Sequence, residues 1–341
     1  METMISDVFI SVIVPVYNEE KYIEGCLQSL LRQDYPKERM EWYFVDGMSQ
    51  DDTVALLGKY KSEYPGLIYI LTNKYKTVPY AMNIGIKKAK GEYIIRLDAH
   101  AEYKPDYISK CVKYLKETGA DNVGGIAITK GKGFTGKCIA KMLSSRFGVG
   151  NSHFRTNGES GYVDTLAFGA FRRESFEKYG YYDTRLTRNQ DNELNYRIRK
   201  NGGKIYLSSD IQFTYYCRDT ITGISDMAMK NGKWNVITYK FCPGSMSIRH
   251  FIPLVFVLSI IILLAFGLII HRFFRYMLYV ELLLYFILDV FFSFKSAKGL
   301  SEFFMLLFLF PIFHIMYGIG SLKGLFALIN MEGNNKCYMK K

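Results

Sequence analysis

The sequence of 341 residues lacks the signatures of several common protein classes. No G-x-G-x-x-G follows its first apolar segment and no G-x-x-x-x-G-K-[ST] occurs, which disfavours an ordinary dinucleotide-binding fold and a P-loop NTPase. The six cysteines are scattered without a C-x-x-C pair, which argues against a zinc cluster. No recognised nucleic-acid-binding motif accompanies the net charge of +12, so a membrane surface or a phosphate-bearing substrate explains this charge better than nucleic acid does.

A secretory signal is also missing from the first residues, METMISDVFISVIVPVY. Their start is acidic, and their apolar run leads into a polar loop rather than a cleavage site. We therefore expect the large N-terminal part to stay in the cytoplasm and the cysteines to be free thiols.

Long hydrophobic runs are abundant, but only after about residue 245. A helix needs about 20 apolar residues to cross a bilayer, and three runs approach that length: 251–270, 276–294 and 303–320. The second run contains Glu281 and Asp289 and the third contains His314, so for these two a buried helix or a re-entrant segment remains an alternative. The connections HRFFR and KSAK are both basic, so charge does not decide the orientation.

The N-terminal part alternates between two kinds of segment. Apolar, β-branched segments predict buried strands at 9–17, 41–46, 67–73 and 92–98. Segments with helical periodicity lie between them, at 19–33, 51–64 and 78–90. This alternation predicts an α/β domain with a mostly parallel central sheet. Further along, residues 222–242 form an amphipathic stretch that suits a membrane surface, with a packed domain helix as the alternative.

Polar side chains follow three of the predicted strands. Asn18 and Glu19 follow the first strand, Asp46 ends the second, and Asp98 and His100 end the fourth. Ligands of parallel sheets bind outside the carboxyl ends of the strands. These residues are therefore expected to line one binding site.

The stretch RLDAHA places a carboxylate, Asp98, and an imidazole, His100, two residues apart. In an extended chain both would point to the same side, where they could share one divalent cation, Mn²⁺ or Mg²⁺. Two protein ligands suit a cation whose other positions are filled by phosphate oxygens and water. The alternative is a strand-end aspartate that only makes turn hydrogen bonds.

Two further aspartates are candidates on position alone. Asp46 is placed to accept a hydrogen bond from a nucleobase, with helix capping as the alternative. Asp51 can cap that helix instead, which would leave Asp46 without a local partner and free for the base. Asp191 opens a predicted helix at 190–200, where it could take a proton from an acceptor hydroxyl or simply serve as the N-cap.

Five motifs together resemble a known family. VIVPVYNEE, VDGMSQDDT, RLDAHAE, GAFRRESFEKYGYYD and NQDNELNYRIRKNG occur in the order and approximate spacing of inverting family 2 glycosyltransferases with a GT-A fold. The closer likeness is to the membrane-bound branch with the succinoglycan-type glucosyltransferases of exopolysaccharide synthesis. The resemblance covers residues 9 to about 240.

The resemblance implies a role for each matching residue. By this resemblance, Pro15, Tyr17 and Glu19 would shape the nucleotide pocket, and Asp46 would recognise the base. Asp98 and His100 would hold the metal on the diphosphate. Gly169 and Ala170 would form the acceptor-side turn, and Asp191 would be the general base.

The stretch KNGKW corresponds to the Q-x-x-R-W motif of related polysaccharide synthases. Lys230 and Lys233 could hold a diphosphate, and Trp234 could stack on a sugar. Lysine replaces the arginine and the glutamine is absent, which disfavours long processive synthesis.

The expected protein is a membrane-anchored, inverting, metal-dependent transferase. Its donor would be a nucleotide sugar, UDP-linked, and its acceptor a saccharide on polyprenyl diphosphate at the cell membrane, with other glycan-assembly enzymes as further partners. A processive synthase, transfer to polyprenyl monophosphate and an inactive scaffold remain alternatives. We expect a cytoplasmic GT-A domain at 1–221 and an amphipathic interfacial segment at 222–248. A multi-pass membrane domain at 249–325 and a polar tail at 326–341 would follow.

Overall fold

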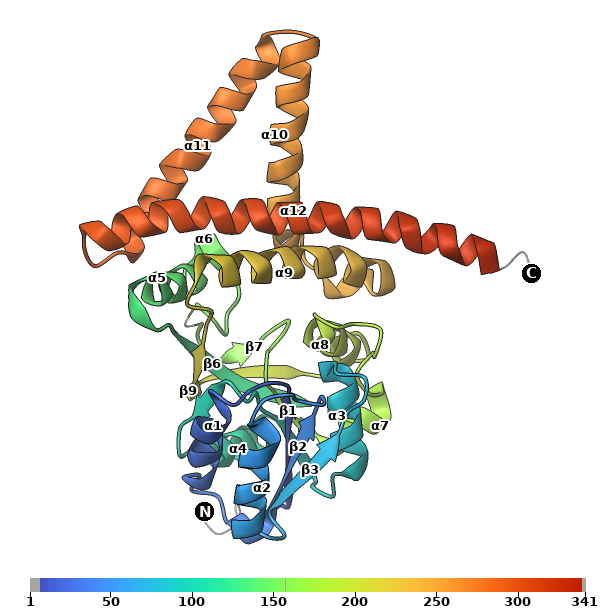
Figure 1. The fold of residues 1–341 in the computed structure, drawn as a ribbon. Coiled ribbons are helices and arrows are strands. Elements are labelled where there is room, and N and C mark those ends of the chain that lie inside the picture. Colours follow the sequence, from blue (N-terminus) through green and yellow to red (C-terminus); the bar gives the residue numbers. More distant parts are fainter. Residues whose placement is uncertain (1–6, 157, 339–341) are drawn as a thin grey trace. The chain divides into compact units, whose positions relative to one another are not determined.

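The computed structural model describes residues 7–156 and 158–338, with side chains as far as residue 329. The chain forms two compact units (Figure 1). The first unit combines Met1–Ile128 with His153–Tyr216, and the second combines Thr129–Ser152 with Cys217–Lys341.

The first unit is built on a mixed sheet. Its strands are β1 (Ile10–Val16), β2 (Met40–Asp46), β3 (Ile68–Thr72), β4 (Tyr93–Arg96), β5 (Ala101–Tyr103), β6 (Asn122–Lys130), β7 (Gly161–Tyr162), β8 (Ala170–Arg172) and β9 (Ile205–Tyr216). They follow the order β3-β2-β1-β4-β8-β6-β9-β5, with β7 beside β9. The four strands from β3 to β4 are parallel, as predicted, whereas β8 runs antiparallel to β4 and β6.

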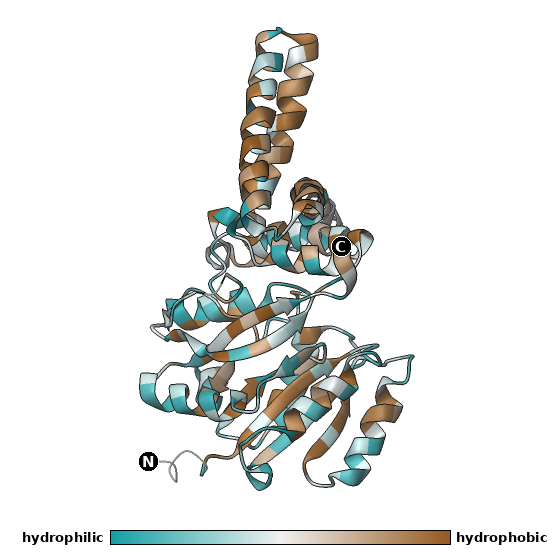
Figure 2. Ribbon diagram, turned by 90° about the vertical axis from the view of Figure 1, so that its left-hand side faces the viewer, coloured by the Kyte–Doolittle hydropathy of each residue, from teal (hydrophilic) through white to brown (hydrophobic). Residues whose placement is uncertain are grey.

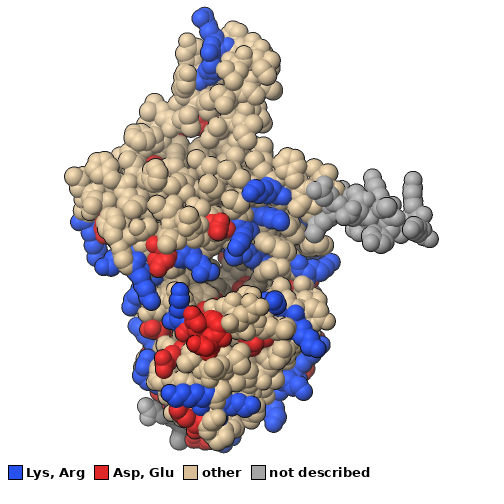
Figure 3. Space-filling model, in the orientation of Figure 1, with Lys and Arg blue, Asp and Glu red and all other residues tan. Residues whose placement is uncertain are grey.

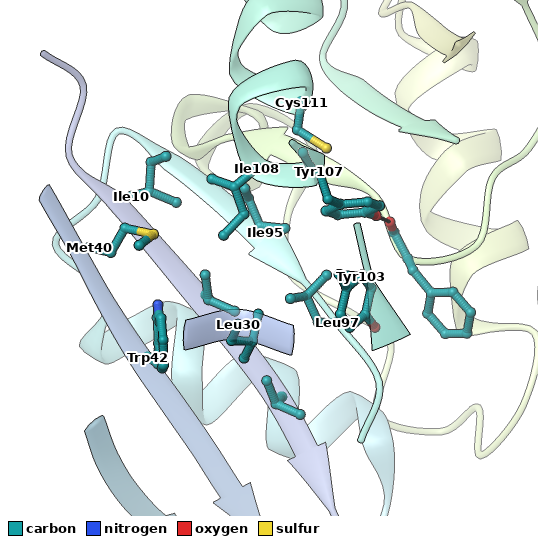
Figure 4. Close-up of a cluster of buried hydrophobic side chains, with 14 of the residues drawn as sticks. Ile10, Leu30, Met40, Trp42, Ile95, Leu97, Tyr103, Tyr107, Ile108 and Cys111 are labelled. Carbon is teal, nitrogen blue, oxygen red and sulfur yellow. Dashed lines mark hydrogen bonds between the residues drawn. The ribbon is translucent and has the colours of Figure 1, made fainter. Parts of the chain in front are cut away.

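Helices cover both faces of this sheet (Figure 1). They are α1 (Ile23–Leu31), α2 (Thr53–Glu63), α3 (Val78–Lys88), α4 (Tyr107–Thr118), α7 (Arg173–Tyr179) and α8 (Gln190–Lys200). Alternate residues of β1 separate the two cores: Val12 packs with α1, α2 and α4, whereas Ile13 packs with α3, α7 and α8. Figure 4 shows part of the first core, where Leu30 and Ile108 lie over the strands. Burial on both faces explains why these strands are nearly continuous apolar runs.

The second unit is helical. Its helices are α5 (Gly133–Leu143), α6 (Arg146–Val149), α9 (Ile221–Phe241), α10 (Ile252–Ile269), α11 (Phe273–Ser296) and α12 (Leu300–Tyr338). Among the residues that the structure describes, three helices are long and apolar enough to cross a membrane. Their mean hydropathies are 3.0 for α10, 1.9 for α11 and 2.0 for α12 as far as Ile329. Figure 2 shows that most of the α10–α11 hairpin is apolar, with hydrophilic residues at its tip.

Polar side chains within these apolar helices have partners in the same unit. Glu281 accepts a hydrogen bond from Ser259 Oγ of the neighbouring helix at 2.5 Å. Tyr285 Oη lies 2.9 Å from His314 Nδ1, and His314 Nε2 lies 2.9 Å from the carbonyl oxygen of Phe147. Such pairing lowers the cost of burying polar groups among apolar side chains.

Candidate active site

Two loops are tied together where β1 and β2 end. The backbone N–H of Asn18 donates to Ser49 Oγ at 2.9 Å, and Asn18 Oδ1 accepts from the N–H of Gln50 at 2.8 Å. Asn18 has a φ of 54°, a left-handed conformation that asparagine tolerates better than most residues. The cross-links fix Tyr17 and Glu19 on one loop relative to the loop after Asp46.

The buried carboxylate of Asp46 organises the second loop. It accepts hydrogen bonds from the N–H of Met48 at 3.0 Å, the N–H of Ser49 at 3.1 Å and Ser49 Oγ at 2.6 Å. Asp51 does bond the start of α2, through the N–H of Thr53 at 3.1 Å. The expectation that this would leave Asp46 without local partners is wrong, because Asp46 supports its own loop. Local donors engage both carboxylate oxygens, because the N–H of Ser49 also lies 3.2 Å from Asp46 Oδ2.

Exposed aromatic side chains lie beside these loops. Tyr17 is 42% exposed, and Lys76 Nζ lies 5.7 Å from the centre of its ring. Pro15 lies two residues earlier in β1, opposite Val45 of β2. An exposed ring beside a cation can stack a base while the cation contacts a phosphate.

The loop after β4 brings a second group of residues together. His100 Nδ1 lies 3.3 Å from Glu19 Oε1, and His100 Nε2 lies 3.7 Å from Asp98 Oδ2. Residues 99 and 100 form a turn rather than the expected extended strand, because β4 ends at Arg96. The expected proximity of Asp98 and His100 is nevertheless present, with the buried Ala99 beneath the turn.

The chemistry of this group fits a divalent cation. Two ligand atoms that each bind an ion at about 2.1 Å are about 3 Å apart when they meet it at a right angle, and about 4.2 Å apart when they lie on opposite sides. The distance between Asp98 Oδ2 and His100 Nε2, 3.7 Å, falls within this range. Within the described side chains, no cluster of three or more His, Cys, Asp or Glu residues could hold a metal by itself. Asp98 and His100 would therefore need phosphate oxygens or water to complete the coordination.

Asp191 lies in the first turn of α8, and its carboxylate forms an ion pair with Arg96 of β4. The N-cap position belongs to Asn189, so Asp191 is not the N-cap. Arg96 Nη2 also lies 3.9 Å from Asp98 Oδ1, and the guanidinium lies 5.3 Å from the ring centre of Phe168. One buried arginine thus links the candidate base to the candidate metal ligand.

Burial and the ion pair have opposite effects on the pKa values of Asp191 and Arg96. Burial raises the pKa of Asp191, and the adjacent charge of Arg96 opposes that shift. Burial alone would lower the pKa of Arg96, but the carboxylate of Asp191 outweighs it and keeps the guanidinium charged. Two carboxylates, those of Asp98 and Asp191, face the guanidinium of Arg96, and a third, that of Glu19, lies beside His100. This excess of negative charge favours a divalent cation beside Asp98.

Sequence reasoning missed Arg96. Its side chain is only 4% exposed, although arginine is rarely buried unless paired. A signal was present, because YIIRLD places one charge inside an otherwise apolar strand. Its partner, 95 residues later, could not be identified from that stretch.

Gly169 and Ala170 lie behind this cluster. Ala170 begins β8, and the carbonyl oxygen of Gly169 accepts a hydrogen bond from the N–H of Arg96 at 3.0 Å. A Cβ on Gly169 would lie 1.8 Å from Asn122 Oδ1, so no larger residue fits. This close approach holds the backbone of Arg96 in place.

The remaining predicted residues belong to the second unit. Lys230 and Lys233 are exposed on α9, and Trp234 is partly buried there. The residues brought together in the first unit are Glu19, Arg96, Asp98, His100 and Asp191.

Comparison with known proteins is consistent with this architecture. Residues 11–180 match the model of glycosyl transferase family 2. In fold, the chain resembles the mannosyltransferase PcManGT of Pyrobaculum calidifontis, solved with GDP-Man and Mn²⁺, with a TM-score of 0.62 and 17% identity over 92% of this chain and 87% of that one.

Two relatives extend the likeness over most of their own length. A dolichyl N-acetyl-alpha-D-glucosaminyl phosphate 3-beta-D-2,3-diacetamido-2,3-dideoxy-beta-D-glucuronosyltransferase of Methanococcus voltae is 33% identical over 62% of this chain and 68% of its own. The succinoglycan biosynthesis protein ExoA of Rhizobium meliloti (strain 1021) is 28% identical over 71% of this chain and 74% of its own. The family match, the relatives and the GT-A-like sheet agree, and this chain is a glycosyltransferase that belongs to family 2.

Proposed function

We propose that the protein is a membrane-anchored, inverting glycosyltransferase that moves one sugar from a nucleotide diphosphate, UDP-linked, to a lipid-linked saccharide. The observation that carries the proposal is the convergence of Glu19, Arg96, Asp98, His100 and Asp191 at the ends of β1 and β4. The three apolar helices support the membrane part of the proposal.

The donor would lie along the carboxyl edge of the parallel strands. Tyr17 offers an exposed ring to the base, and Pro15 shapes the pocket. Asp46 would accept a base N–H in exchange for one of its bonds to Ser49. Asp98 and His100 would hold Mn²⁺ or Mg²⁺ on the diphosphate, where the cation supplies charge stabilisation to the leaving group. The backbone of Gly169 and Ala170 would bound the acceptor side.

Asp191 acts as the general base. Its carboxylate accepts the proton of the acceptor hydroxyl as the oxygen attacks the anomeric carbon from the face opposite the diphosphate. The C–O bond to the diphosphate breaks as the new glycosidic bond forms, so configuration inverts. Arg96 keeps the carboxylate oriented and ionised between turnovers.

Two relatives support the proposed acceptor class. The name of the Methanococcus voltae relative describes an acceptor on dolichyl phosphate, and the name of ExoA describes succinoglycan biosynthesis. We extend this to an acceptor saccharide on a polyprenyl diphosphate, in exopolysaccharide or cell-surface glycan synthesis at the cytoplasmic face of the cell membrane. On α9, Lys230 and Lys233 could contact its phosphates and Trp234 its sugar.

The test is transfer of radiolabelled sugar from a panel of nucleotide sugars to a lipid extract by protein purified in detergent. Asp191→Asn should reduce transfer by about 10²- to 10⁴-fold, because it removes the base while keeping the shape. Asp210→Asn, which changes an exposed aspartate of β9, is the matched control and should keep full activity. A rate for Asp191→Asn within a few-fold of the control contradicts the assignment.

Product length separates the proposed single transfer from a processive synthase. A single added sugar supports the proposal, whereas a ladder of long products on a gel indicates a processive synthase.

A further inference from the structure

Helix α12 packs side by side with α9 within the second unit (Figure 1). A Cβ on Gly320 would lie 2.1 Å from the carbonyl oxygen of Met229, and one on Gly232 would lie 2.0 Å from that of Tyr317. Small residues at such points allow helix backbones to touch. Asn235 Nδ2 also donates to Tyr317 Oη at 2.7 Å, so the pairing of the two helices is specific.

Helix α10 meets α12 from another direction. A Cβ on Gly318 would lie 2.3 Å from the carbonyl oxygen of Pro253, near the start of α10. From this point the α10–α11 hairpin extends away across the axis of α12, as Figures 1 and 2 both show. Two helices that cross in this way do not both lie along the membrane normal.

The surface of α12 is divided into two faces. One face of α12 carries exposed, large apolar side chains. At 3.6 residues per turn these positions form one stripe along the helix: Leu300, Phe304, Phe308, Ile315, Leu325, Phe326 and Ile329. Gly318, which meets α10, lies on the same side as this stripe. Gly320 and Gly324, which meet α9, lie on the opposite side.

The charges of α9 show which helix is suited to cross. Lys230 and Lys233 are exposed on α9 close to Gly320 and Gly324 of α12. If α12 crossed the bilayer, these lysines would be carried to membrane depth, where a charge is costly. Helix α10 of the hairpin contains no charged residue, and its 18 residues span about 27 Å, close to the hydrocarbon thickness of about 30 Å.

We propose that α12 lies along the membrane surface. Its apolar stripe enters the acyl chains of one leaflet, α9 lies on its aqueous side, and α10 and α11 are the two crossings within residues 7–338. The exposed Arg272 and Arg275 lie where α10 gives way to α11, and Figure 3 shows a basic group at the tip of the hairpin. These basic side chains then reach the opposite headgroups. This proposal does not depend on the sugar-transfer chemistry.

Cysteine labelling tests the arrangement in the full-length protein. Cys26, Cys111, Cys138 and Cys217 are buried, and Cys242 and Cys337 are first changed to serine. Three exposed positions then receive one cysteine each: His271→Cys at the hairpin tip, Lys323→Cys in α12 and Lys61→Cys in α2 as the marker for the first unit. A membrane-impermeant maleimide is applied to right-side-out and inverted vesicles.

Two crossings predict that Lys323→Cys labels from the same side as Lys61→Cys, and His271→Cys labels from the opposite side. A third crossing would place Lys323→Cys with His271→Cys, which overturns the proposal. Labelling of all three variants from one side, or of Lys323→Cys from neither side, also overturns it.

Discussion

At the scale of single residues, the ion pair of Arg96 and Asp191 decides how the proposed base behaves. Burial raises the pKa of Asp191 above the usual value of about 3.9 for aspartate. A base must be unprotonated, so activity is expected to fall as the pH drops through this raised value. The acidic limb of kcat/KM should therefore lie above pH 3.9.

Substitution of Arg96 tests this electrostatic role. Arg96→Met removes the positive charge that opposes the burial effect, so the acidic limb should move to higher pH. Arg96→Lys keeps the charge and should leave the limb close to that of the unchanged protein. The measurement is kcat/KM against pH for both variants, and an unmoved limb in Arg96→Met would show that the arginine has a purely structural role.

His100 carries a second prediction at this scale. Chelation should abolish transfer, and Mn²⁺ or Mg²⁺ should restore it. His100→Ala should raise the metal concentration for half-maximal activity by about 10- to 100-fold, because it removes one of two protein ligands. His153→Ala makes the same change outside the cluster and should not alter this concentration. Equal metal requirements in the two variants would contradict the ligand role.

At the scale of elements, the contact of α9 with α12 depends on glycine. Gly320→Leu places a side chain where even a Cβ lies 2.1 Å from Met229 O, so the helices must separate. We expect a loss of about 1–3 kcal/mol in the free energy of unfolding. Thermal unfolding in detergent measures the effect.

Gly299→Leu is the control for this substitution, because a Cβ at Gly299 has no neighbour within 4 Å. It introduces the same side chain just before α12 and should leave the unfolding temperature nearly unchanged. Equal effects of the two variants would mean that the close approach of α9 and α12 does not stabilise the protein.

At the scale of the whole molecule, the two units have different surroundings. The first unit buries its apolar side chains on both faces of a sheet, so it needs no lipid. The second unit leaves large apolar side chains exposed along α10, α11 and α12. Exposed apolar area of this extent indicates contact with a membrane. The labelling experiment on residues 61, 271 and 323 belongs to this scale, because it reports how the chain as a whole crosses the bilayer.

The sequence by itself determined the parallel strands and their helices. Residues 9–17 and 41–46 are mostly apolar because β1 and β2 are buried on both sides, and this pattern is local. It also predicted that Asp98 and His100 would lie close together, because only one residue separates them. The hydrophobic helices followed from length and composition alone.

Tertiary structure decided what depends on residues distant in sequence. The antiparallel pairing of β8 with β4, the ion pair of Arg96 with Asp191 and the packing of α9 against α12 join segments about 75 to 95 residues apart. No periodicity within one segment encodes such a partner, because each contact depends on how both segments are held by the rest of the fold.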